Sequence, residues 1–167
     1  QGGLDLASSA ERPQTRDFRL REAPAELPQL VVAKNDPDPA ALVRKAVAAI
    51  GGMGRFISRG DIVVVKPNIG WDRTPLHAAN TNPLVVAEVV RLAYDAGAKN
   101  VIVTDASCNE PNRCFQRSGI WKAAYDVGAE VILPVAHRFR SMRLKGEVLD
   151  EWPVYLPLVS ADKIINV

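Results

Sequence analysis

A run of four apolar residues that opens directly into a long polar loop most constrains the fold of this chain. Residues 62–65 read Ile-Val-Val-Val, so every member of the run is β-branched. Such residues favour strands, and a strand exposed on one face would alternate apolar with polar residues. The run therefore predicts a strand that is buried on both faces, as in a parallel sheet covered by helices.

Strand and helix patterns alternate along the rest of the chain. Apolar runs predict strands at residues 30–33, 62–65, 101–104, 131–133, 154–156 and 163–167. Asp38-Pro39 and Asn82-Pro83 each place an N-cap residue before a proline, which is how many helices begin. Apolar residues at helical spacing follow both signals, and a third helix is predicted after Ser118-Gly119. Residues 136–152 are predicted to be irregular, with a turn at Lys145-Gly146.

This alternation predicts a Rossmann-like α/β fold, with a doubly wound, mostly parallel sheet and helices on both faces. Residues 1–28 are rich in polar residues, proline and alanine, and predict an extended N-terminal arm. Residues 29–167 form the predicted α/β domain. Because residues 163–167 read as a core strand that nothing follows, we expect a sheet that is incomplete at its C-terminus. A longer chain, or a second chain as protein partner, would complete it.

The composition excludes several classes of protein. Apolar residues make up 47% of the chain, the net charge is only +2 and 6% of residues are aromatic. These values are typical of an ordinary globular domain and give no signature of nucleic-acid binding. No apolar run approaches the roughly 20 residues of a transmembrane helix.

Polar side chains gather at the predicted carboxyl ends of two neighbouring strands, which is where α/β sheets bind ligands. They are Lys66, Asn68, Asp72, Arg73, Thr81, Asn82 and Asp105. Lysine and arginine bind anions, and the start of a helix near Asn82 adds positive potential. We predict that this loop binds a small anionic ligand or a metal, either alone or as part of an enzyme. For each single residue the alternative is a structural role, such as N-capping by Asn82.

Cys108 and Cys114 are the only two cysteines, and five residues separate them. The first interpretation is a disulfide that closes a short loop. The second is half of an iron–sulfur or zinc site, which would need further ligands from elsewhere. The third is a pair of free thiols. One alternative function is a redox module that uses both cysteines. Another, suggested by the N-terminal arm and the last strand, is a structural or interaction subunit of an extracytoplasmic assembly.

Several motifs, taken together, resemble the domain-of-unknown-function 362 (DUF362) family. They are residues 60–68, Thr81-Asn82-Pro83, residues 96–98 and Thr104-Asp105, and they occur in the family's order. Residues 108–120 are similar to a subgroup of exported members made with a twin-arginine signal peptide. The resemblance covers the N-terminal portion of the family.

The resemblance implies an α/β domain of a bacterial protein in the periplasm or outside the cell, with its signal peptide removed. The chain begins with Gln1 rather than methionine, as a processed, trimmed or partial product would. Some relatives carry an additional ferredoxin-like iron–sulfur segment, which this chain lacks. The cofactor stays unknown, with a metal or an iron–sulfur cluster as the candidates. The resemblance identifies neither a substrate nor a catalytic residue.

Overall fold

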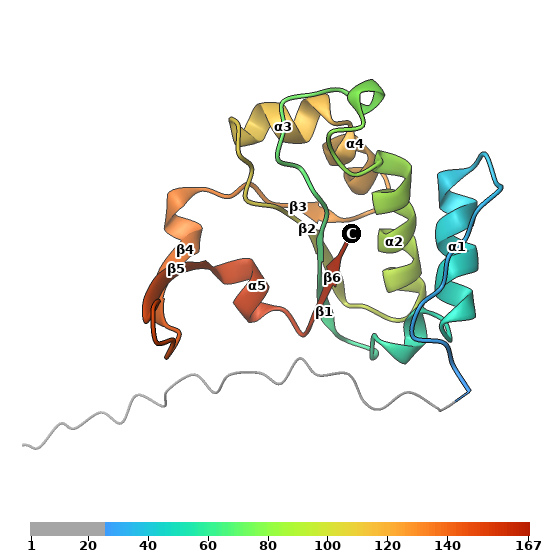
Figure 1. Ribbon diagram of the computed structural model, residues 1–167, viewed down its shortest axis with the longest axis horizontal. Helices are drawn as coiled ribbons and strands as arrows, with labels where there is room; N and C mark the ends of the chain where they lie inside the picture. Colours follow the sequence, from blue (N-terminus) through green and yellow to red (C-terminus); the bar gives the residue numbers. More distant parts are fainter. Residues whose placement is uncertain (1–25) are drawn as a thin grey trace, which may run out of the picture.

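A four-stranded parallel sheet forms the centre of the protein, whose computed structural model describes residues 26–167 (Figure 1). Its strands lie in the order β3-β2-β1-β6. They are β1 (Ile62–Lys66), β2 (Asn100–Val103), β3 (Glu130–Val131) and β6 (Lys163–Asn166). The expectation of a parallel α/β sheet is therefore confirmed. The arm predicted at residues 1–28 lies almost entirely outside the described residues.

Strand β1 is buried on both faces, as its composition predicts. Val63, Val64 and Val65 have no exposed surface. Val63 and Val65 belong to the main hydrophobic core, together with Val101 and Val103 of β2. Because side chains alternate along a strand, Val64 and Lys66 point to the opposite face. Full burial of a valine contributes roughly 1.5–3 kcal/mol, so this strand is a large part of what stabilises the domain.

The main core lies between the sheet and the helices α2 (Pro83–Asp95) and α4 (Ile120–Tyr125), with α1 (Pro39–Ala49) packed beside α2. The predicted caps are present. The side chain of Asp38 accepts hydrogen bonds from the N–H groups of Ala40 and Ala41, and that of Asn82 accepts one from Leu84. Gly97 follows α2 at φ 100°, and a Cβ there would lie 3.2 Å from the Cα of Arg59. Glycine therefore suits this position on both counts.

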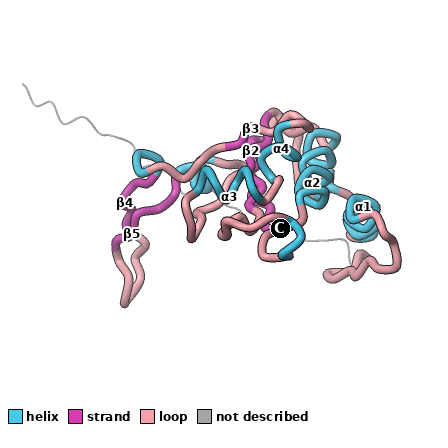
Figure 2. The backbone as a smooth tube through the Cα atoms, turned by 90° about the horizontal axis from the view of Figure 1, so that it is seen from above, coloured by secondary structure: helices cyan, strands magenta, loops and turns pink. Residues whose placement is uncertain are grey.

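The other side of the sheet carries smaller elements. Figure 1 shows the short helix α5 (Leu156–Ser160) and a β-hairpin on the side opposite α1 and α2. The hairpin pairs β4 (Phe139–Arg143) with β5 (Glu151–Tyr155) in antiparallel register. Figure 2 shows it projecting from the body of the protein. The remaining helix is α3 (Pro111–Arg117), and single 3₁₀ turns lie at η1 (Met53–Arg55), η2 (Pro75–His77) and η3 (Ala136–Arg138).

Two predicted segments differ from the structure. Residues 30–33 form no strand, and Leu30 and Val32 are 80% and 77% exposed. Their apolar character gives no strand without a neighbour to pair with, and residues 26–167 supply none. Residues 136–152, predicted to be irregular, contain most of the hairpin. There Phe139 stacks on Tyr155 across the two strands, with ring centroids 4.9 Å apart. The predicted turn at Lys145-Gly146 lies in its connection, where Lys145 has φ 57°.

Candidate functional site

A lysine and an aspartate meet at the carboxyl ends of the two central strands. Lys66 ends β1 and Asp105 follows β2, and the distance from Lys66 Nζ to Asp105 Oδ1 is 3.2 Å. The other carboxylate oxygen of Asp105 accepts the backbone N–H of Ile69 at 2.7 Å. The Asp105 side chain is only 8% exposed, whereas that of Lys66 is 38% exposed. Both oxygens of the carboxylate therefore have partners within the protein, while part of the lysine side chain stays accessible to solvent.

Thr104 precedes Asp105 in the chain and lies on the face of the sheet that carries Lys66. Its hydroxyl forms a buried pair with that of Tyr155. Thr104 Oγ1 donates to the carbonyl of Ile132 at 2.7 Å and lies 2.7 Å from the Tyr155 hydroxyl. Since the threonine has one hydroxyl proton, the tyrosine must donate in the second bond. Burial raises the pKa of Tyr155, and the nearby Arg138 opposes that shift. Tyr155 is therefore a fixed hydrogen-bond donor near neutral pH rather than a base.

Strand register adds Asn166 to this face. Lys66 pairs with Asn166 between the parallel strands β1 and β6, and paired residues of parallel strands point to the same side. Asn166 is exposed. At the carboxyl ends of the strands, this face therefore presents the Lys66 ammonium and the Asn166 amide beside the buried Thr104–Tyr155 pair.

Most of the other predicted ligand-binding residues hold the loop itself. Asn68 donates through its side-chain amide to the carbonyl of Ala79 at 3.1 Å and accepts the N–H of Gly70 at 3.2 Å. Thr81 accepts the N–H of Asn68 at 2.9 Å and donates to the carbonyl of Val167 at 3.1 Å. Together with the N-cap Asn82, these side chains fix the path of the loop between β1 and α2. Ligand binding by them stays a prediction.

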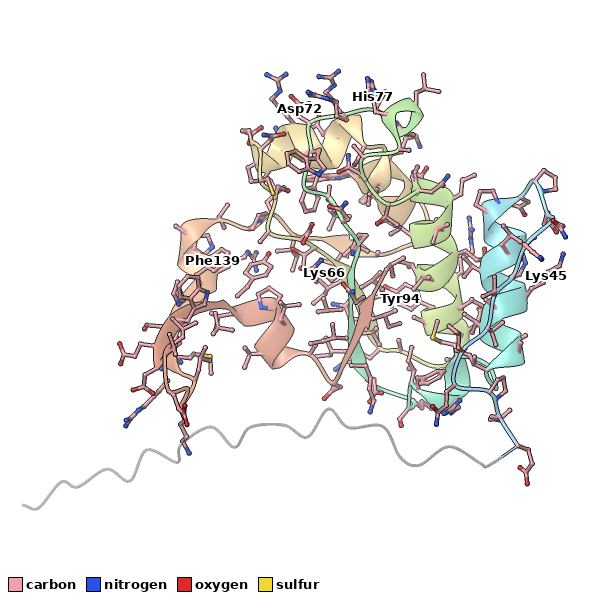
Figure 3. The ribbon with its side chains drawn as sticks, viewed as in Figure 1. Lys45, Lys66, Asp72, His77, Tyr94 and Phe139 are labelled. Atoms are coloured by element: carbon pink, nitrogen blue, oxygen red, sulfur yellow. The ribbon has the colours of Figure 1, made fainter. Side chains whose placement is uncertain are left out.

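Asp72 is the centre of a separate ionic cluster. Its carboxylate lies 2.8 Å from Arg113 and 3.1 Å from Arg117, both on α3. Arg73 donates to the backbone carbonyl of Asp72 at 2.8 Å. Figure 3 shows Asp72 near His77 at one end of the protein, well away from Lys66. The structure therefore does not bring Asp72 and Arg73 together with Lys66 and Asp105, and two arginines already neutralise the Asp72 carboxylate.

The comparison with known families applies to the whole region of the site. Residues 63–167 match the model of a family described as "Domain of unknown function (DUF362)". The chain belongs to the DUF362 family. The match spans more than half of the chain and contains Lys66, Asp105, Tyr155 and Asn166. The exported twin-arginine subgroup of DUF362 stays a prediction.

One curated relative shares part of this DUF362 chain. It is the thylakoid-associated protein sll1697 of Synechocystis sp., which is 41% identical over 59 residues. That stretch is 35% of this chain and 18% of the relative, so the match spans less than a fifth of the relative's length. No solved structure matches the chain.

The two cysteines of this DUF362 chain are free thiols, so the predicted disulfide is not shown. Cys114 is buried in α3, with its sulfur 3.6 Å from the carbonyl of Gly70, and burial raises the pKa of its thiol. Cys108 is exposed. A raised pKa leaves less of the reactive thiolate at this buried cysteine.

A metal or an iron–sulfur cluster is likewise not shown by the described residues. Among residues 26–167, no group of three or more histidine, cysteine, aspartate or glutamate residues could hold a metal ion. A structural zinc or iron–sulfur site normally needs four such ligands. In the same described part of the chain, no helix has the length and apolar character to cross a membrane.

Sequence reasoning missed three residues of the candidate site. Asn166 ends a short apolar run, which was a usable signal once that run was placed beside residues 62–65. The sequence predicts Thr104 at the end of a strand but does not indicate that its hydroxyl is buried. Tyr155 had no signal, because only the hairpin brings it to Thr104.

Proposed function

We propose that this domain binds a small anion, a carboxylate or a phosphate, at the end of the sheet face that carries Lys66 and Asn166. The observation that carries the proposal is the asymmetry of the Lys66–Asp105 pair. Asp105 is buried and holds the ammonium group at 3.2 Å, while 38% of the lysine side chain stays exposed. A positioned and accessible ammonium group offers charge-assisted hydrogen bonds to an anion without first ordering a flexible side chain.

The charges around the site favour an anion over a cation. Lys66 and Asp105 form a neutral pair, and Arg138 is close enough to Tyr155 to act on its pKa. The neutral amide of Asn166 is a further donor beside Lys66. Lys66 and Arg138 carry two positive charges, and Asp105 carries one negative charge. The local excess of positive charge attracts anions from solution.

The predicted metal site is the less favoured form of this function. Asp105 uses one carboxylate oxygen for Lys66 and the other for Ile69. Asp72 is neutralised by Arg113 and Arg117. A cation at either carboxylate would have to displace a paired positive charge, which costs more than binding at an open carboxylate.

Calorimetric titration with inorganic phosphate and with malonate tests the proposal. We expect Lys66→Gln to weaken binding by about tenfold or more, because a hydrogen bond to a charged group contributes about 1.5–3 kcal/mol. Glutamine retains a donor for Asp105 and so limits the loss of stability. Lys122→Gln is the matched control, since Lys122 is 81% exposed and lies on α4, where it pairs with Asp126. Equal affinities of wild type and Lys66→Gln for both anions would contradict the proposal.

A further inference from the structure

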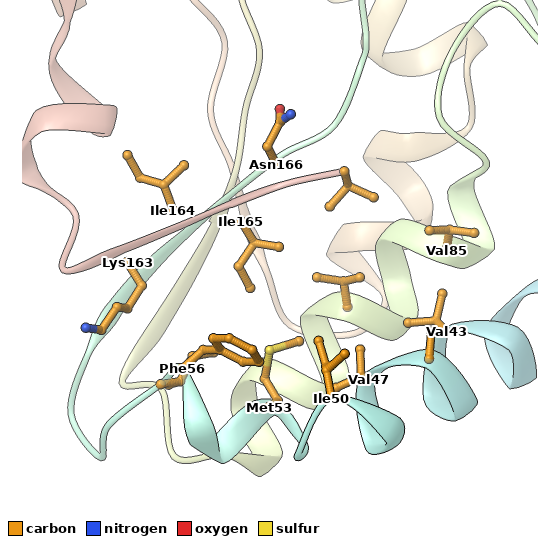
Figure 4. A pocket seen from close by; sticks show the side chains of 14 residues that line it. Val43, Val47, Ile50, Met53, Phe56, Val85, Lys163, Ile164, Ile165 and Asn166 are labelled. Atoms are coloured by element: carbon orange, nitrogen blue, oxygen red, sulfur yellow. The ribbon is translucent and has the colours of Figure 1, made fainter. Parts of the chain in front are cut away.

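An apolar groove runs between helix α1 and strand β6. Its volume is about 600 Å³, and it is lined by α1, the turn η1, α2 and the whole of β6. Figure 4 shows Val43 and Val47 of α1, and Ile50 just after it, facing Ile165 of β6 across the groove, with Met53 next to Ile50. None of the residues of α1 is fully buried. The apolar side of α1 therefore overhangs the edge of the sheet without a strand beneath it.

Strand β6 has a free edge along this groove. It is the outermost strand of the sheet and pairs only with β1 among the described residues. The N–H of Val167 donates to the carbonyl of Lys66 on β1, at 3.0 Å. Because backbone groups point alternately to the two sides of a strand, those of Ile164 and Asn166 face the free edge. Such an edge is a ready template for a further strand.

The segment of residues 30–33 has the apolar side chains that would suit this groove and the free edge of β6. Leu30 and Val32 alternate along it and are 80% and 77% exposed. The segment is held at both ends against its own α1 region. Leu27 packs where a Cβ of Gly51 would lie, and Asp36 forms a 2.6 Å ion pair with Lys45. The two exposed side chains are therefore presented to solvent by an anchored segment.

We propose that two copies of this chain associate by placing residues 30–33 of each copy against β6 of the other, with Leu30 and Val32 in the partner's groove. The segment and the groove both flank α1, so one two-fold arrangement satisfies both contacts at once. In this arrangement, the backbone of residues 30–33 in one copy pairs with the outward backbone groups of Ile164 and Asn166 in the other. This inference concerns the edge of the sheet and does not require anion binding at Lys66.

Light scattering coupled to size-exclusion chromatography of the 167-residue chain, across a dilution series, tests this association. We expect a mass of twice 18.2 kDa at high concentration, falling to 18.2 kDa on dilution. Leu30→Asp with Val32→Asp places charges on two side chains that are already exposed, so the monomer fold is retained. This double variant is expected to remain a monomer at every concentration.

Val148→Asp is the matched control, since Val148 is fully exposed on the hairpin connection and lies outside the proposed interface. It should associate like the wild type. Hydrogen exchange at the amides of Ile164 and Asn166 should slow as the wild type associates, and stay fast in the double variant. A wild type that is monomeric throughout would overturn the proposal. So would a dimer that the double variant retains, or protection of residues 30–33 within a monomer.

Discussion

Replacing Asp105 with alanine is the most direct perturbation of the site, because the carboxylate performs two measurable tasks. It accepts the N–H of Ile69 at 2.7 Å and pairs with Lys66 at 3.2 Å. Ile69 is fully buried, so its N–H would be left without an acceptor, at a cost of about 1–3 kcal/mol. The ion pair adds about 1 kcal/mol, because Lys66 is partly exposed and water screens its charge. Asp105→Ala should therefore lower the free energy of unfolding by about 2–4 kcal/mol.

Urea unfolding, followed by circular dichroism with a common m value, measures this difference. Asp105→Asn is the informative companion, since it keeps an acceptor for Ile69 and loses only the charge. It should cost about 1 kcal/mol. A double-mutant cycle with Lys66→Met isolates the pair, and we expect a coupling energy of about 1 kcal/mol. A loss below about 0.5 kcal/mol for Asp105→Ala, in the range of ordinary surface substitutions, would refute the view that this carboxylate holds the loop.

Three further predictions concern other parts of the domain. Because the pKa of Tyr155 is raised in the folded state, the folded protein binds more protons than the unfolded chain above about pH 10, so stability should fall as the pH rises through that range. Thermal melts of wild type and Tyr155→Phe should converge there, and an unchanged difference would contradict the burial argument. Thiol labelling of the native protein should modify the exposed Cys108 quickly and the buried Cys114 only on unfolding; two unreactive cysteines that become reactive only with reductant would instead reveal a disulfide. Asn82→Ala removes the cap of α2 and should cost about 1 kcal/mol in urea unfolding, whereas Asn82→Asp should retain most of the stability.

The sequence predicted those elements whose signals are local. Residues 62–65 predicted the central strand because a run of β-branched residues without polar alternation is typical of a strand buried on both faces. Asp38-Pro39 and Asn82-Pro83 gave the starts of α1 and α2, because an N-cap followed by proline fixes the backbone within a few residues. Each of these signals operates over one turn or one strand, and tertiary contacts in this fold reinforce it.

The misses depend on contacts that are distant in sequence. Residues 30–33 have the composition of a strand, but a strand needs a neighbour, and sequence alone does not say whether one is present. Strand β4 and the start of β5 were missed because charged residues interrupt their apolar positions, and the stacking of Phe139 on Tyr155 supplies the cross-strand contact that the pattern does not show. The candidate site combines a residue from each of several strand ends, so Asn166 and Tyr155 became recognisable only after the register was known.

Several of the predicted site residues have a structural role in their loop, and ligand binding by them stays a prediction. Asn68 and Thr81 were selected because polar side chains follow a buried strand. In the structure they bond to the backbone of their own loop and of β6. A long loop between a strand and a helix must satisfy its own N–H and carbonyl groups, and asparagine and threonine do so with short side chains. Composition alone does not separate this task from ligand binding.

The bond from Thr81 to the carbonyl of Val167 gives strand β6 two roles at once. One edge of β6 is free, while its end is tied to the loop that begins at Lys66, and Asn166 pairs with Lys66 itself. Any occupant that orders β6 would therefore also order the donors that face an anion. Linkage then requires the reverse, so that an anion bound at Lys66 tightens the hold of β6 on its occupant by the same factor. The edge of this sheet and its polar end would respond to their ligands as one cooperative unit.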